Sequence, residues 1–221
     1  MNKISTFATQ TFTNSIQMIT IIDVFSFLGA FAFAISGIRL ASKKQFDWFG
    51  AYIVGLVTAI GGGTLRDLLL DQPPFWMEQG WYLISTLLAL LFVVALGKYV
   101  NKLSSSFFVF DTIGLAVFTI AGIEKTLVFG YSYWIAIVMG VMTGCLGGII
   151  RDIFINETPL IFRKEIYAIA SIIGGILYLV SLHVFNLSEL ISYVIGFSSI
   201  VLVRFLAVKY EISLPQLRDS Q

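Results

Sequence analysis

Long apolar segments alternate with short polar ones along almost the whole chain. Each apolar segment holds about 20 residues, the number that a helix needs to cross a hydrocarbon core of roughly 30 Å. The gaps hold Lys, Asp, Asn, Pro or Ser, which are typical of turns at a membrane surface. We therefore predict an all-α membrane protein with seven transmembrane helices, near residues 18–38, 47–70, 80–97, 107–125, 131–155, 166–183 and 190–208.

The composition supports this interpretation. Of the 221 residues, 57% are hydrophobic and only 12% are charged, and the mean hydropathy is +0.90. Soluble proteins carry roughly 25% charged residues, so a soluble globule of this chain would expose more apolar surface than water tolerates. A lipid bilayer is therefore the expected surrounding of the protein.

Few side chains are available for catalysis or metal binding. The chain has one cysteine, Cys145, and one histidine, His183, and its net charge is only +1. A transition-metal site or a His-based triad therefore has little to draw on. The glycine-rich segment 61–66 is not followed by the Lys and Ser/Thr of a phosphate-binding loop. We expect no enzyme activity, no cofactor, no metal and no nucleic-acid partner.

Lysine and arginine are distributed unevenly between alternate polar segments. One side of the predicted membrane carries nine of them, and the other side carries two. The nine are Arg39, Lys43, Lys44, Lys98, Lys102, Arg163, Lys164, Lys209 and Arg218, and the two are Lys3 and Lys125. Because cytoplasmic segments carry the excess of positive charge, the N-terminus is expected outside and the C-terminus in the cytoplasm.

The chain repeats itself with an offset of 85 residues. At this offset Gly62-Gly63 aligns with Gly147-Gly148, and Arg66-Asp67 aligns with Arg151-Asp152. Each copy contains three predicted spans, an odd number, so the second copy enters the membrane from the opposite side, as in many transporters. The expected organisation is a polar tail at 1–17, a first three-helix repeat at 18–105, an inverted second repeat at 106–186, a seventh helix at 187–208 and a cytoplasmic tail at 209–221.

Both copies place glycines in the middle of a predicted span. Glycine in a helix interior costs about 1 kcal/mol relative to alanine, so the second and fifth helices are expected to kink or break there. Backbone carbonyls that are released in this way need protein or a water-filled path as a partner. The residues expected to line such a path are Thr58, Gly61, Gly62, Gly63, Thr64, Thr143, Gly147 and Gly148.

The Arg-Asp pairs belong to the same predicted path, one near each mouth. A charged side chain at the bilayer centre costs about 3 kcal/mol on insertion scales, so each pair should face a partner or water. Arg66 and Asp67 are expected toward the outer end of the second helix, and Arg151 and Asp152 toward the cytoplasmic end of the fifth. Two compatible roles remain open for them: lining a pore and clamping the two repeats together.

Three further polar residues are weaker candidates. Ser36 and Lys125 are considered as possible gate residues. The simpler interpretations are helix packing for Ser36 and a snorkelling interfacial lysine for Lys125. Asp111 begins the fourth predicted span, where we expect it to cap the helix.

Taken together, these segments resemble the prokaryotic branch of the trimeric intracellular cation (TRIC) channel family. The resemblance covers the chain from about Phe25 to Phe205 and includes bacterial membrane proteins with the GGGTLRDLLL and PPFW signatures. It rests on residues 33–37, 61–70, 73–76, 111–114, 147–152 and 159–163.

The resemblance implies a homotrimer in a bacterial inner membrane. Each protomer would hold its own pore around kinked second and fifth helices and would pass monovalent cations, mainly K⁺. Leu146 departs from the family pattern, because it interrupts in the second repeat the triple glycine of the first. The basic lipid-binding motif of animal relatives is not evident beyond Glu124-Lys125, so phosphoinositide control is not carried over.

Two functions are compatible with these features. Passive cation conduction is the leading hypothesis, in which carbonyls and hydroxyls replace part of the hydration shell of the ion. The alternative is a secondary transporter of a small zwitterion such as glycine, because half-helix N-termini at a break within the membrane can bind a carboxylate. A purely structural scaffold is disfavoured, since charged residues placed twice within lipid usually have a task.

Overall fold

The computed structural model describes residues 21–102, 106–162 and 166–213. Within these ranges the chain is helical and contains no strand, as the all-α prediction requires. Its elements are α2 (Ile21–Lys43), α3 (Trp48–Leu69), α4 (Phe75–Glu78), α5 (Trp81–Lys102), α6 (Ser106–Val128), α7 (Tyr133–Phe154), the 3-10 helix η1 (Leu160–Phe162), α8 (Ala168–His183) and α9 (Glu189–Lys209).

Five helices are long and apolar enough to cross a membrane, namely α2, α3, α6, α7 and α9. The apolar parts of α5 and α8 are shorter, and α8, with 16 residues, extends over only about 24 Å at 1.5 Å per residue. α2 continues to Lys43, beyond the predicted end at residue 38. The predicted tail at 1–17 lies outside the described residues.

α3 and α7 turn back in the same way where they end. Immediately after the two helices, Asp71 and Asn156 adopt positive φ angles of 55° and 57°. Asp and Asn tolerate this left-handed conformation better than most residues. Positions 71 and 156 are related by the 85-residue offset, so the two copies share a local structure as well as a sequence pattern.

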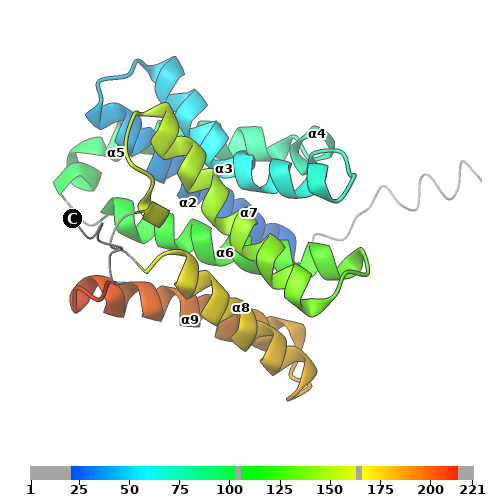
Figure 1. Cartoon of the computed structure of the whole chain (residues 1–221). Helices are drawn as coiled ribbons and strands as arrows, with labels where there is room; N and C mark the ends of the chain where they lie inside the picture. Colours follow the sequence, from blue (N-terminus) through cyan, green and yellow to red (C-terminus); the bar gives the residue numbers. More distant parts are fainter. Residues whose placement is uncertain (1–20, 103–105, 163–165, 214–221) are drawn as a thin grey trace, which may run out of the picture.

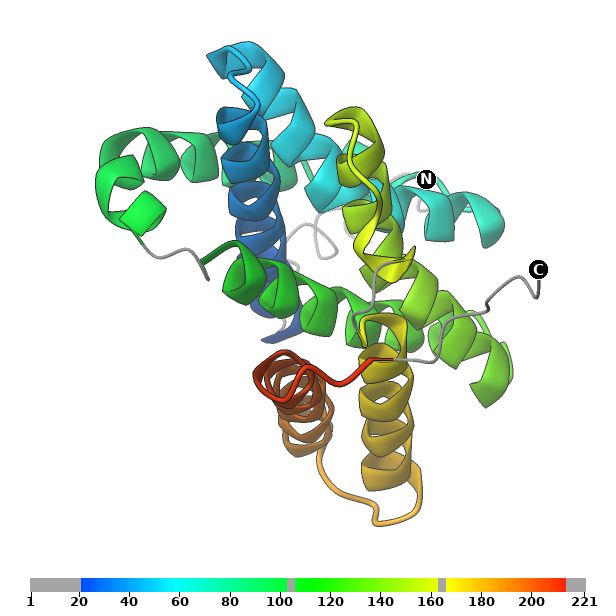
Figure 2. The ribbon, with the colours of Figure 1, turned by 60° about the vertical axis from the view of Figure 1, so that its left-hand side comes forward.

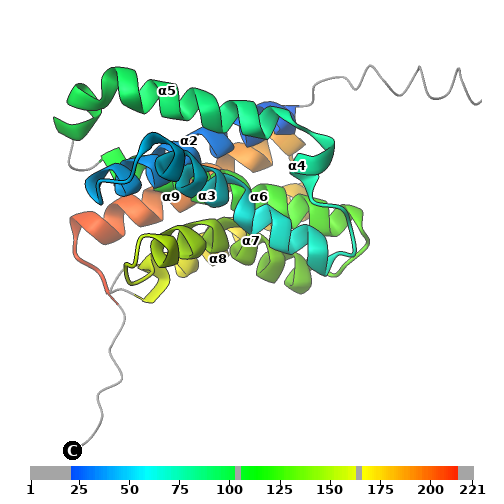
Figure 3. The same ribbon diagram turned by 90° about the horizontal axis from the view of Figure 1, so that it is seen from above.

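α2 and α6 form the centre of the bundle. α2 packs against α3, α5 and α6, while α6 packs against α7, α8 and α9. α8 and α9 lie side by side at one margin of the bundle (Figures 1 and 2). Seen from above, α5 lies on the side opposite to α7 and α8 (Figure 3). The contact between α2 and α6 therefore joins α2, α3 and α5 to α6, α7, α8 and α9.

α3 and α7 cross at their glycines. A side-chain carbon added to Gly62 would overlap the carbonyl oxygen of Thr143, and one added to Gly147 would overlap that of Thr58. The two backbones therefore touch at this crossing, as small residues permit in membranes. Both helices run unbroken through their glycines. Of the two predicted outcomes the break is wrong, because the backbone of the opposite helix fills the space that the missing side chains leave, whereas the kink stays a prediction.

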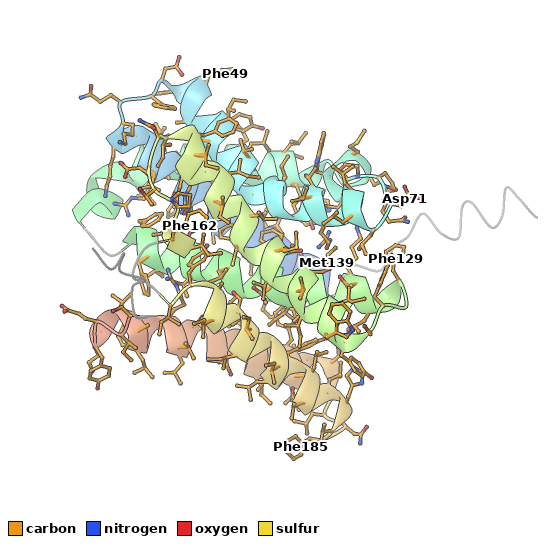
Figure 4. All side chains as sticks on the ribbon, in the orientation of Figure 1. Phe49, Asp71, Phe129, Met139, Phe162 and Phe185 are labelled. Atoms are coloured by element: carbon orange, nitrogen blue, oxygen red, sulfur yellow. The ribbon has the colours of Figure 1, made fainter. Side chains whose placement is uncertain are left out.

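The connections between helices lie at two ends of the bundle. Asp71, which follows α3, and Phe129, which follows α6, are at the same end (Figure 4). Phe162, which follows α7 and belongs to η1, lies toward the other end (Figure 4). This distribution is the one expected when each long helix runs from one end of the bundle to the other.

Candidate functional site

The first Arg-Asp pair lies near the end of α3. Nε of Arg66 donates a hydrogen bond to Oδ1 of Asp67 at 2.8 Å, and the backbone amide of Phe75 donates one to Oδ2 at 2.8 Å. Nζ of Lys125, on α6, lies 2.9 Å from the same Oδ1. Asp67 is completely buried, and Arg66 is 6% exposed. One carboxylate thus faces two cations, and this group of three charges has an excess of one positive charge.

The second pair has the same local geometry near the end of α7. Nε of Arg151 donates a hydrogen bond to Oδ1 of Asp152 at 2.8 Å, and the backbone amide of Leu160 donates one to Oδ2 at 3.1 Å. Nη1 of Arg151 also donates to Oγ of Ser36, on α2, at 2.6 Å and to Oδ1 of Asp111, on α6. Arg151 is fully buried. Its hydrogen-bond partners come from its own helix α7, from α2 and from α6.

Each pair is bound by a helix from the opposite half of the chain. Lys125 belongs to the second half and contacts Asp67 of the first. Ser36 belongs to the first half and contacts Arg151 of the second. Neither residue is therefore accounted for by its simpler interpretation alone: the lysine makes a specific ion pair, and the serine hydroxyl accepts a buried hydrogen bond. These contacts join the two halves of the chain at both Arg-Asp pairs.

A second arginine reaches Asp111 from α9. Nη2 of Arg204 lies 3.5 Å from Oδ2 of Asp111, and its guanidinium lies over the rings of Phe108 and Tyr167, at 4.8 Å and 4.7 Å from their centres. Arg204 is 1% exposed. Together with the second Arg-Asp pair, this cluster holds two arginines and two carboxylates. Its charges therefore balance, unlike those at the end of α3.

A cavity adjoins each of the two Arg-Asp pairs. The cavity at Arg66 has a volume of about 640 Å³, and the cavity at Asp152 has about 390 Å³. Three lining residues of the first cavity, Phe75, Lys125 and Val128, correspond at the 85-residue offset to three of the second, Leu160, Leu40 and Lys43. The two cavities thus lie at partly corresponding positions in the two halves of the chain.

The threonines of the predicted path are hydrogen-bonded within their own helices. Thr58 and Thr143 donate to the carbonyl oxygens of Val54 and Met139, both at 2.6 Å. Each of the two threonines is at most 1% exposed. Thr64 donates to its own helix and accepts a hydrogen bond from the indole of Trp76 at 3.0 Å. In this conformation each of the three hydroxyl groups donates its hydrogen to a backbone carbonyl of its own helix.

The glycines of the predicted path fall into two groups. Gly62 and Gly147 lie at the crossing of α3 and α7, as described above. The other three face side chains instead: Gly61 faces Ile150, Gly63 faces Phe75, and Gly148 faces the hydroxyl of Tyr167. The structure therefore brings part of the predicted set together at the crossing and distributes the rest along the two helices.

The site predicted from the sequence does not include Arg204, and it gives Asp111 only the role of a helix cap. The expected helix cap is wrong, because α6 already begins at Ser106 and Asp111 lies inside it. The charges within the predicted apolar segments could have indicated that Arg204 needs a carboxylate partner. The second half of the chain carries two arginines in such segments, Arg151 and Arg204, and only Asp152 next to either of them. The second arginine required another carboxylate within the membrane.

The internal duplication is confirmed by comparison with known families. The profile of a family described as "Glycine transporter" matches residues 23–98 and, a second time, residues 108–183. Both limits of the second match lie 85 residues after those of the first. The two matches together cover more than half of the chain.

Close relatives are membrane proteins of bacteria. A UPF0126 membrane protein of Vibrio cholerae is 40% identical over 201 residues, which cover 90% of this chain and 82% of that protein. The UPF0126 inner membrane protein YadS of Escherichia coli K12 is 38% identical over 190 residues, which cover 85% and 92%. Among solved structures, the TRIC trimeric intracellular cation channel orthologue from Rhodobacter sphaeroides matches with a TM-score of 0.81 and 32% identity, over 87% of this chain and 100% of the other. The chain therefore belongs to the prokaryotic TRIC channel family.

Proposed function

We propose that this protein is a channel for monovalent cations, mainly K⁺, that works as a homotrimer with one pore in each protomer. The family supports a cation channel, since the relative from Rhodobacter sphaeroides is a trimeric intracellular cation channel orthologue. The observation that carries the proposal is the pair of partly corresponding cavities, each of which is lined by one member of a buried Arg-Asp pair.

The proposed path joins these two cavities through each protomer. Glu124 and Glu189 line the cavity at Arg66, and acidic groups at a mouth raise the local concentration of cations. Asp152 lines the second cavity, and Asp67 is hydrogen-bonded to Arg66, which lines the first. Because each carboxylate binds an arginine, an ion passes only when these charges rearrange. The buried ion pairs therefore correspond to a closed state of the path.

The proposed protomer has seven membrane-spanning helices, α2, α3, α5, α6, α7, α8 and α9. The first six form two inverted three-helix repeats, over residues 18–105 and 106–186, and α9 follows them. The positions of Asp71 and Phe162 toward opposite ends of the bundle support the inversion (Figure 4). We further propose that the protein lies in a bacterial inner membrane, because the Escherichia coli relative is named an inner membrane protein. Its N-terminus would lie outside and its C-terminus in the cytoplasm.

Ion replacement in planar bilayers tests the channel. Purified protein should give unitary currents in potassium gluconate, and these should vanish when K⁺ is replaced by the large cation N-methyl-D-glucamine. Equal currents in N-methyl-D-glucamine chloride would instead mean an anion path. Light scattering on the same sample should report a protein mass three times the 24.5 kDa of one chain.

A second candidate, uptake of a small zwitterion such as glycine, is favoured by one specific observation. The cavity at Arg66 is lined by Arg66 and Lys125 and also by Glu124 and Glu189. The cations would bind the carboxylate of such a ligand and the acids its ammonium group. The unbroken helices remove the half-helix argument, so this cavity now carries the alternative. Saturable uptake of labelled glycine into proteoliposomes without unitary currents favours the transporter, whereas unitary currents without uptake favour the channel.

A further inference from the structure

Asp111 is shared by two arginines that come from different helices. Its Oδ1 accepts a hydrogen bond from Arg151 on α7, while its Oδ2 lies 3.5 Å from Nη2 of Arg204 on α9. Oδ2 accepts no hydrogen bond from any of the described residues. All three side chains are at most 1% exposed. The carboxylate thus accepts a hydrogen bond from one arginine and forms a longer ion pair with the other.

A small movement is enough to reverse this preference. Donor and acceptor atoms of an N–H···O hydrogen bond lie about 2.9 Å apart, so Arg204 needs to approach Asp111 by only about 0.6 Å. Its guanidinium lies over two aromatic rings, and its Nε donates a hydrogen bond of 3.4 Å to Oγ1 of Thr112. Within the described part of the chain, Nη2 of Arg151 and the hydroxyl of Tyr167 have no hydrogen-bond partner. Both are therefore ready to bind water that enters with a rearrangement.

We propose that Asp111 exchanges Arg151 for Arg204 and thereby allows the Arg151 end of the path to open. The inference rests on the proposed function, because it concerns a gate of the same path. A buried carboxylate that loses a hydrogen-bonded cation is destabilised unless another cation compensates. Arg204 already forms an ion pair of 3.5 Å with Asp111, so it can take over the hydrogen bond when Arg151 leaves. In this exchange α9, which lies outside the duplication, supplies the second arginine.

The arrangement of one aspartate between two arginines lies at the Arg151 end of the path. At the 85-residue offset, the position that corresponds to Asp111 holds Ser26, which lines the cavity at Arg66. A serine carries no charge that two arginines could share. The two ends therefore open by different means, although their Arg-Asp pairs have the same geometry.

Variants of the full chain in planar bilayers test the exchange through open probability. Arg204→Met removes the alternative partner and leaves Asp111 to hold Arg151 alone, so open probability should fall by about tenfold or more. Asp111→Asn weakens the hold on Arg151, so open probability should rise. Arg204→Lys keeps the charge and should give a value between those of Arg204→Met and the wild type.

Cys145 provides a second readout that does not depend on current. It is the single cysteine of the chain, it is 2% exposed, and it precedes Gly148 by one helical turn on α7. A side-chain carbon at Gly148 would contact Tyr167 and Asp111, so this face of α7 borders the cluster. Labelling of Cys145 by N-ethylmaleimide should be slower in Arg204→Met and faster in Asp111→Asn than in the wild type. Cys145→Ser measures the background labelling.

The outcomes separate the two proposals. Faster labelling and higher open probability in Arg204→Met, or no change in either variant, would overturn the exchange. If the wild-type protein passes no current, the channel proposal fails, whereas the labelling rates still decide about the exchange. If Arg204→Met does not assemble by light scattering, Asp111→Asn decides alone, and labelling there that is unchanged or slower counts against the exchange.

Discussion

Asp67 and Asp152 hold equivalent places in the two halves of the chain. Each accepts a hydrogen bond from Nε of the preceding arginine at 2.8 Å and another from the backbone amide eight residues later, at 2.8 Å and 3.1 Å respectively. The segment after each helix is thereby tied to the carboxylate. What differs is the partner from the opposite half, since Asp67 pairs with Lys125 whereas Arg151, beside Asp152, bonds to Ser36.

The first prediction concerns the carboxylate of Asp67. Asp67→Asn leaves Arg66 and Lys125 without a negative charge between them, so cations entering the cavity meet more positive potential. Unitary K⁺ conductance should fall by about twofold at low salt and by less at high salt, because mobile ions screen the charges. Conductance measured over a series of KCl concentrations tests this. Asp71→Asn, in the exposed turn after α3, is the matched control.

Lys125→Met should have the opposite effect. It removes one of the two cations that face Asp67 and leaves a balanced Arg-Asp pair at the cavity. Unitary K⁺ conductance should therefore rise at low salt, again by about twofold. Lys209→Met removes an exposed lysine at the end of α9 and should leave conductance unchanged. Equal effects of the two lysine variants would contradict the position of Lys125 on the path.

The crossing of α3 and α7 makes Gly62→Ala destabilising. The added carbon overlaps a backbone carbonyl oxygen, which cannot rotate away as a side chain does. We expect a loss of about 1–3 kcal/mol in the free energy of unfolding, visible as a lower melting temperature in detergent. Gly97→Ala on α5 is the control, because a side-chain carbon there meets nothing within 4 Å. A melting temperature for Gly62→Ala no lower than that of the control would argue against the close crossing.

Ser36→Ala should weaken the contact between the two halves. It removes the hydroxyl that accepts from Nη1 of Arg151 at 2.6 Å, in a site without exposure to solvent. The expected cost is at least about 1–3 kcal/mol, which is the range for a buried donor that loses its acceptor and is exceeded by charged donors. Ser199→Ala is the control, because that hydroxyl donates to the carbonyl oxygen of Ile195 in its own helix. Chemical unfolding of both variants in the same detergent gives the comparison.

The helices and the duplication were predictable from the sequence because both depend on local patterns. Apolar runs of about 20 residues locate the helices, and the offset of 85 residues brings Arg66-Asp67 onto Arg151-Asp152 without any knowledge of the fold. The need of each buried arginine for a carboxylate also follows from the cost of charge in lipid. These parts of the site required no tertiary information.

The remaining parts depend on contacts between distant segments. A glycine in a helix is compatible with a break and with a close crossing, and only the position of Thr143 against Gly62 decides between them. The pairing of Lys125 with Asp67 and of Arg204 with Asp111 joins residues on different helices. Hydrophobic patterning places such residues at a depth in the membrane, but it does not say which helices are neighbours.

The reversal potential of unitary currents across a KCl gradient tests the central claim most directly. With purified wild-type protein in a planar bilayer, the proposed path predicts currents that reverse close to the K⁺ equilibrium potential. Reversal at the Cl⁻ equilibrium potential, or the absence of unitary currents from protein that takes up glycine saturably, would contradict a cation path between the two cavities.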